Sequence, residues 1–94
     1  MKENEMGITF QVSLYPIMQN DIRKPINNFI EDLKEAKLDV EVHETSTIGS
    51  GNIDYVFDVL KRAYMRASES GDTIMVLTVS NACPTKEELE KLNS

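Results

Sequence analysis

Small polar side chains gather near the ends of three predicted strands of this chain. They are Ser13 and Tyr15 in the first strand, Thr45, Ser46 and Thr47 in the second, and Ser80 and Asn81 in the last. Hydroxyl and amide groups both donate and accept hydrogen bonds. They suit recognition of a flat, neutral, polar ring better than they suit acid–base catalysis. Tyr15 and Phe57 add aromatic surface on which such a ring can lie.

Three other features invite a chemical role, and a structural role explains each of them better. His43 is the only histidine, and together with Glu41 it supplies too few ligands for a metal site. Cys83 is the only cysteine and has no identifiable activating base. The glycine-rich stretch 49–51 lacks the spacing of a phosphate-binding loop and is interpreted as a turn. We therefore expect no metal, no cofactor and no catalytic residue.

Six elements are predicted to position the polar groups. Alternation of apolar and polar residues predicts a strand over 7–15, which Pro16 ends. The remaining predictions are a helix from about 21–24 to 37, a strand over 38–47, a turn with room for a short third strand over 48–52, a helix over 53–69 and a strand over 73–81. This order is that of the ferredoxin-like βαββαβ sandwich, an α+β fold with a four-stranded antiparallel sheet and two helices on one face.

Local signals refine these elements. Asn20 or Asp21 is expected to cap the first helix, with Pro25 in its first turn. The second helix is predicted to bury one apolar face made of Ile53, Val56, Phe57, Leu60, Ala63, Tyr64 and Ala67. After Pro84, the sequence 85–88 resembles a capping box and predicts a short C-terminal helix. The whole chain, residues 1–94, is predicted to be one domain with its core over about 7–84.

The last strand carries apolar residues on both of its faces. Ile74 and Val76 would point one way, and Met75 and Leu77 the other. A strand with one face in water alternates more cleanly. We therefore expect the helix-free face of the sheet to be covered by a second copy of the chain, as a homodimer or homotetramer.

The bulk composition limits the classes of partner. The chain has 94 residues, 40% of them hydrophobic, and a net charge of −6. This charge argues against nucleic acid, because such binding depends on Lys and Arg that neutralise phosphates. No apolar run approaches the roughly 20 residues that span a bilayer, and the polar N-terminus lacks a signal-peptide pattern. We therefore expect a cytoplasmic protein with no membrane partner.

Four segments in this order resemble the small thiamine-binding protein family related to YkoF. They are residues 11–16 (QVSLYP), 45–48 (TSTI), 54–57 (DYVF) and 79–84 (VSNACP). The resemblance covers about residues 7–84. It implies a ferredoxin-like fold, assembly into dimers or tetramers through the sheets, no catalysis, and binding of thiamine or its hydroxymethylpyrimidine moiety.

The resemblance also implies which residues bind the aminopyrimidine. By position these are Ser13, Tyr15, Thr45, Ser46, Thr47, Phe57, Ser80 and Asn81. The glycine-rich stretch departs from the family pattern, since relatives more often carry an acidic residue near the glycine.

Two alternative functions compete with this interpretation. A regulatory module that binds another small metabolite at an oligomer interface is compatible with the fold, although only by analogy. A small enzyme of the acylphosphatase type would need an arginine in an anion site. Arg23, Arg62 and Arg66 lie in helical stretches without a recognisable phosphate cradle.

Overall fold

The computed structural model describes residues 6–82 of the chain. Its elements are β1 (Gly7–Pro16), α1 (Arg23–Glu35), β2 (Asp39–Val42), β3 (Thr47–Asn52), α2 (Ile53–Ala67), a short 3₁₀ helix (Ser68–Ser70) and β4 (Thr73–Ser80). The predicted C-terminal helix and Cys83 lie outside the described residues.

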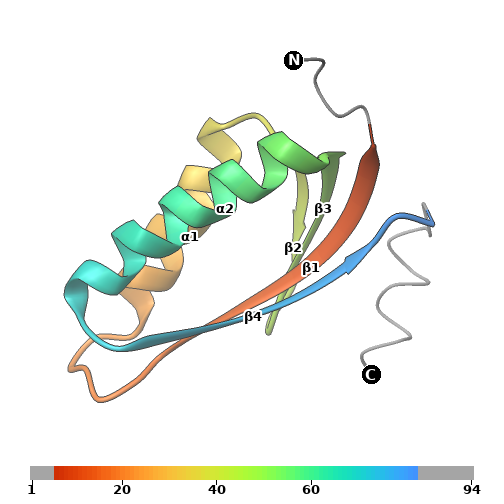
Figure 1. The fold of residues 1–94 in the computed structure, drawn as a ribbon. Helices are drawn as coiled ribbons and strands as arrows, with labels where there is room; N and C mark the ends of the chain where they lie inside the picture. The colour runs from red at the N-terminus through yellow and green to blue at the C-terminus, as the bar shows by residue number, and fades with distance from the viewer. Residues whose placement is uncertain (1–5, 83–94) are drawn as a thin grey trace.

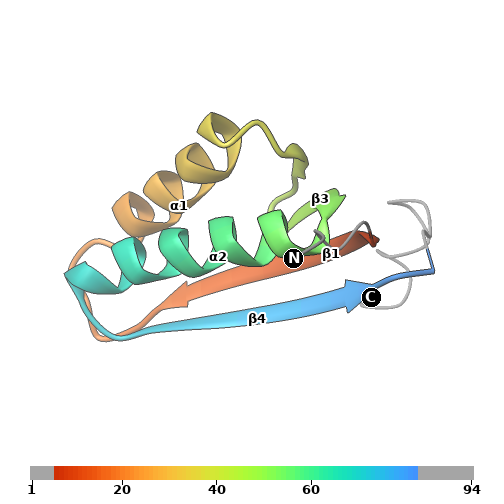
Figure 2. The ribbon, with the colours of Figure 1, turned by 45° about the horizontal axis from the view of Figure 1, so that its top comes forward.

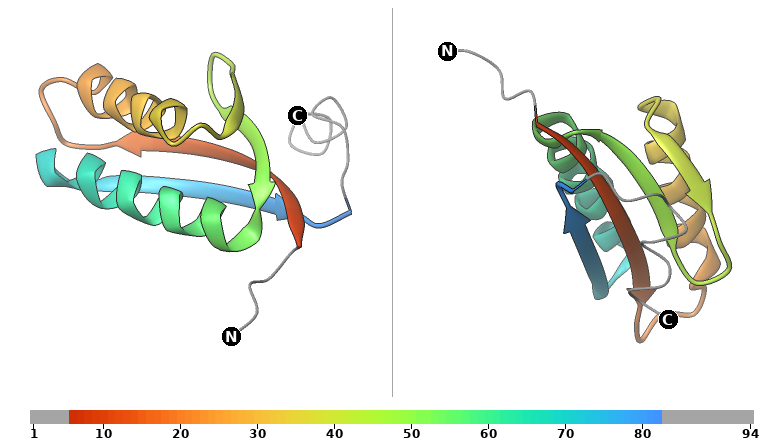
Figure 3. Two further views of the ribbon diagram at one scale, coloured as in Figure 1. Left: turned by 90° about the horizontal axis from the view of Figure 1, so that it is seen from above. Right: turned by 90° about the vertical axis from the view of Figure 1, so that its right-hand side faces the viewer.

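The four strands form one antiparallel sheet in the order β2-β3-β1-β4. The right-hand view of Figure 3 shows the strands side by side in this order. Both helices lie on the same face of the sheet (Figures 1 and 2). The predicted ferredoxin-like α+β sandwich is thus confirmed for the described residues.

The core lies between the sheet and the two helices. Alternate residues of β1, namely Ile8, Phe10 and Val12, are buried against the helices. Phe29 and Leu33 cover them from α1, and α2 contributes Val56, Val59, Leu60, Ala63 and Ala67. Apolar residues at every second position of β1 therefore pack against apolar residues at helical spacing in α1 and α2, as the sequence pattern predicts.

The glycine-rich stretch forms the short third strand that the prediction left room for, and its interpretation as a turn is wrong. Gly49, Ser50 and Gly51 lie inside β3, which pairs with β1 on one side and β2 on the other. A Cβ atom on Gly49 would lie 2.6 Å from Cζ of Phe10. Glycine is required there because the Phe10 ring packs directly on the β3 backbone, so close packing explains this residue.

The second strand is shorter than predicted. β2 ends at Val42, and residues 43–46 form the turn into β3, closed by a hydrogen bond from the His43 backbone N to the Ser46 carbonyl oxygen at 2.8 Å. Thr45 and Ser46 therefore lie in a turn, and Thr47 opens the next strand. The polar run that sequence alone assigned to a strand is the connection of a hairpin.

The first helix starts at Arg23, within the predicted range, whereas its capping residue and its end differ from those predicted. Ile22 takes the N-cap position without a side-chain cap, while Oδ1 of Asp21 accepts a hydrogen bond from Arg23 N at 3.0 Å. The helix ends at Glu35, and Lys37 has a φ of +62°, which is incompatible with a continued helix.

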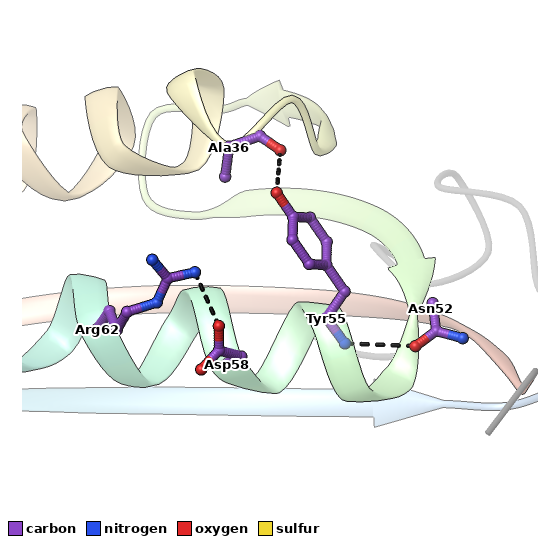
Figure 4. Close-up of polar contacts among 5 residues, drawn as sticks. All are labelled: Ala36, Asn52, Tyr55, Asp58 and Arg62. Atoms are coloured by element: carbon purple, nitrogen blue, oxygen red, sulfur yellow. Dashed lines mark hydrogen bonds and ion pairs between the residues drawn. The ribbon is translucent and has the colours of Figure 1, made fainter. Parts of the chain in front are cut away.

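The second helix is fixed at its start. Oδ1 of Asn52 caps it by accepting from the backbone N atoms of Asp54 and Tyr55. Figure 4 shows the bond from Tyr55 N to Asn52, and also the Tyr55 hydroxyl donating to the Ala36 carbonyl oxygen at 2.6 Å. The predicted apolar face needs one correction. Phe57 is 43% exposed, and Val59 is buried in the core instead.

Candidate ligand-binding site

A cavity lies where the sheet changes from four strands to two. The pairing of β1 with β3 ends at Val12 and Thr47, whereas β1 continues to Pro16 alongside β4. Figure 1 shows β1 and β4 extending past the turn between β2 and β3. One edge of residues 13–16 therefore has no strand neighbour, and the space beside it is bounded by α1 and the β2–β3 turn.

This cavity has a volume of about 250 Å³ and contrasting walls. Its lining consists of Val12, Ser13, Leu14 and Tyr15 from β1, Ile26, Phe29 and Ile30 from α1, and His43, Glu44, Thr45, Ser46 and Thr47 from the hairpin. The α1 side is wholly apolar, and the hairpin side supplies hydroxyls, a carboxylate and an imidazole. An apolar cavity with a few convergent polar groups is the common form of a small-ligand site.

Direct contacts hold the hairpin wall in place. The Ser13 hydroxyl donates to the Thr45 carbonyl oxygen at 2.9 Å, which ties the turn to β1. Nε2 of His43 lies 3.2 Å from Oε1 of Glu41, so the two polar groups of this strand end are neighbours. The polar side of the cavity is therefore partly preorganised.

The structure brings together five of the predicted site residues. Ser13, Tyr15, Thr45, Ser46 and Thr47 all line this one cavity. Thr47 is only 4% exposed, so it belongs to the deep part of the lining, whereas Tyr15 is 48% exposed and borders the mouth.

The other three predicted residues lie at the opposite end of the sheet. Ser80 pairs with Thr9, four residues before Ser13, which places it about 13 Å away along β1. Asn81 follows Ser80, and Phe57 lies in the first turns of α2, which starts directly after β3 ends. The cause is strand direction. β2 runs in the same direction as β1, so the C-terminal ends of both lie at the same end of the sheet, whereas β4 is antiparallel to β1 and finishes at the opposite end.

The sequence did not predict seven of the twelve residues that line the cavity. Ile26, Phe29 and Ile30 appear in the sequence as an ordinary apolar helix face, because periodicity does not separate core packing from cavity lining. His43 has no metal-ligand spacing, and Glu44 belongs to no recognisable pattern in the sequence. Within residues 6–82, no three His, Cys, Asp or Glu side chains group as a metal site.

The described part of the chain also contains no helix that is both long and apolar enough to cross a membrane. The fold and cavity together define a ferredoxin-like α+β domain with a candidate small-molecule pocket at one end of its sheet. More particularly, the chain belongs to the YKOF-related family, whose model matches residues 7–86.

A curated relative and several solved structures are similar to this chain. The relative, from Bacillus subtilis, is named "Putative HMP/thiamine-binding protein YkoF" and is 34% identical over 76 residues, which are 80% of this chain and 38% of the relative. This chain thus spans well under half the length of that protein.

The solved structures share the fold at low sequence identity. A Streptococcus pneumoniae protein has a TM-score of 0.78 at 20% identity, covering 95% of this chain and all of the other. A Thermotoga maritima protein described as a "putative thiamine biosynthesis/salvage protein" has a TM-score of 0.76 at 15% identity, covering 92% and 98% of the two chains. A Bacillus cereus domain of unknown function has a TM-score of 0.76 at 22% identity, covering 95% and 94%.

Proposed function

We propose that this chain is a non-catalytic protein that binds thiamine through its hydroxymethylpyrimidine moiety, in the cavity between β1, α1 and the β2–β3 turn. The observation that carries the proposal is that Ser13, Thr45, Ser46 and Thr47 line one cavity together with an apolar wall from α1. The printed names of the Bacillus subtilis and Thermotoga maritima proteins support the same class of ligand.

The size of the cavity favours the pyrimidine ring as the part that is enclosed. Pockets for drug-sized ligands are about 300–1,000 Å³, and this cavity is about 250 Å³. One substituted six-membered ring fits such a space better than both rings of thiamine do. The cationic thiazolium ring would then lie at the mouth, where Glu44 offers a carboxylate.

Self-association is the second part of the proposal. Tyr15, Ile74 and Val76 lie on the helix-free face of the sheet and are each about half exposed. Tyr15 pairs with Ile74, and Val76 pairs with Ser13, so the three form one apolar patch beside the cavity. We propose that a second copy of the chain covers this patch in a cytoplasmic homodimer or homotetramer.

Isothermal titration with hydroxymethylpyrimidine, thiamine and thiamine diphosphate tests the binding proposal. We expect saturable binding of the first two ligands. Thiamine diphosphate should bind more weakly, because its phosphates approach Glu44 on a chain of net charge −6. Failure of all three ligands to bind a folded oligomer would contradict the proposal. The alternative of a regulatory module for another metabolite gains no support from the described residues.

A further inference from the structure

Two backbone hydrogen bonds establish which residues of β1 turn their peptide groups toward β3. Ile53 N donates to the Met6 carbonyl oxygen on the β3 side, and Ile17 N donates to the Asp72 carbonyl oxygen on the β4 side, both at 2.9 Å. Each bond continues the register of its ladder. In an antiparallel strand, the N–H and C=O of one residue both point to the same neighbouring strand, and those of the next residue point to the other. The backbone groups of even-numbered residues of β1 therefore point to β3, and those of odd-numbered residues point to β4.

Leu14 is the even-numbered residue that follows the end of the β1–β3 pairing at Val12. If the pairing continued, Thr45 would stand opposite Leu14. Thr45 instead belongs to the β2–β3 turn, and its carbonyl oxygen accepts from the Ser13 hydroxyl. Among the described residues, no backbone hydrogen bond outside the regular elements joins Leu14 to this turn. Leu14 lines the cavity, and the register directs its N–H and C=O groups to the side of β1 where β3 has ended.

We propose that the backbone N–H and C=O of Leu14 recognise the aminopyrimidine edge of the ligand and thereby determine specificity; this inference rests on the proposed function. In an antiparallel ladder, a residue of this kind exchanges two closely spaced hydrogen bonds with its partner. A 4-aminopyrimidine presents a donor amino group next to an acceptor ring nitrogen. The ligand edge thus takes the place of the missing strand residue, with the amino group donating to C=O and the ring nitrogen accepting from N–H.

The N–H and C=O of Leu14 distinguish a 4-amino from a 4-oxo pyrimidine, whereas the hydroxyls of the cavity accept either. The hydroxyl of Ser46 or Thr47 can rotate to donate or to accept. The N–H and C=O of Leu14 are fixed by the ladder to β4, so they reject a ring edge of opposite polarity. A 4-oxo pyrimidine has that opposite polarity, with C=O where the amine was and N–H on the ring. Inside the cavity, the carbonyl oxygen of the ligand would then face the Leu14 C=O, and the ring N–H would face the Leu14 N–H.

The ligand series on the unaltered protein is the first test. Hydroxymethylpyrimidine and its 4-oxo analogue differ only at the edge that Leu14 is proposed to recognise. We expect the 4-oxo analogue to bind roughly 5- to 150-fold more weakly, the range expected for a buried unpaired polar group. Equal affinity of the two ligands would overturn the inference and leave the proposed function intact. Absence of binding by either ligand would overturn both.

A proline series tests the protein side. Leu14→Pro removes an N–H that takes no part in either ladder and should weaken hydroxymethylpyrimidine binding relative to Leu14→Ala, which keeps the N–H. Val79→Pro is the matched control: its N–H points away from β1, at the other end of the sheet. Val79→Pro should leave the affinity unchanged, and equal affinities of Leu14→Pro and Leu14→Ala would overturn the inference.

The amide signal of Leu14 keeps the inference testable if Leu14→Pro does not fold. In ¹⁵N-labelled unaltered protein, saturation with hydroxymethylpyrimidine should move the Leu14 amide proton downfield, as expected for a newly formed hydrogen bond. The amide of Phe10, already paired with Gly49 in the ladder, is the internal control and should move little. An unmoved Leu14 amide in a saturated sample would overturn the inference.

Discussion

Ser13 lines the cavity, and its hydroxyl holds the turn that forms the polar wall. Its hydrogen bond to the Thr45 carbonyl oxygen links residues 32 positions apart in sequence. Removing the hydroxyl frees the turn from β1, and this turn supplies the polar wall of the cavity. At the scale of single residues, the cavity therefore depends on side chains that shape it as well as on those that touch a ligand.

Ser13→Ala is expected to weaken hydroxymethylpyrimidine binding by about 5-fold, which corresponds to one lost hydrogen bond of ordinary strength. Titration calorimetry on the variant measures this change. Ser80→Ala is the matched control, because Ser80 is a serine on the same sheet whose hydroxyl contacts Ala82 N at the far end. If Ser80→Ala weakened binding as much as Ser13→Ala, the site would extend over both ends of the sheet and the single-cavity proposal would be wrong.

Single residues also show where prediction from sequence stops. Ser13 and Thr47 were found because hydroxyls at strand ends are chemically informative, and both line the cavity. Leu14 was not found, because its proposed role belongs to the peptide group, which every residue has. Its availability follows only from the register of two ladders.

At the scale of elements, β3 is the strand that the sequence predicts least well. Gly49 and Gly51 have the composition of a turn, yet β3 is paired on both sides. The alternation of β1 was predicted correctly because its apolar residues face one core. The glycines of β3 leave no such pattern, since the group that fills the space above Gly49 is the Phe10 ring of the neighbouring strand.

Gly49→Ala should lower the free energy of unfolding by about 1–3 kcal/mol, the usual range for overpacking a core. The added Cβ would lie 2.6 Å from the Phe10 ring and 2.9 Å from the Asp39 carbonyl oxygen, and the second of these is backbone that has little freedom to move. Urea denaturation followed by circular dichroism measures the change.

Gly7→Ala is the control for Gly49→Ala, because a Cβ on Gly7 meets no atom within 4 Å. Its free energy of unfolding should stay close to that of the unaltered protein. Equal stability of the two variants would mean that the Phe10 ring does not pack on β3 in solution.

At the scale of the whole molecule, strand direction decides which polar groups can share a ligand. The order of the elements was predictable from periodicity, and with it the fold. The fold does not bring Ser80 and Asn81 next to Ser13, because β4 finishes beside the start of β1, at the opposite end of the sheet. The same sheet leaves Tyr15, Ile74 and Val76 exposed beside the cavity, on the face without helices.

Val76→Glu is therefore expected to shift the protein from oligomer to monomer in sedimentation velocity at micromolar concentration. A carboxylate in the centre of an apolar contact loses its water without gaining a partner, which opposes association. Met65→Glu is the matched control: Met65 is similarly exposed, at 58% against 51% for Val76, but lies on α2, away from the helix-free face of the sheet. It should sediment like the unaltered protein. Association through the sheet would be contradicted if the unaltered protein is a monomer, or if both variants dissociate to the same extent. Ligand titration of a Val76→Glu monomer would show whether binding in the cavity beside Tyr15 needs the second copy.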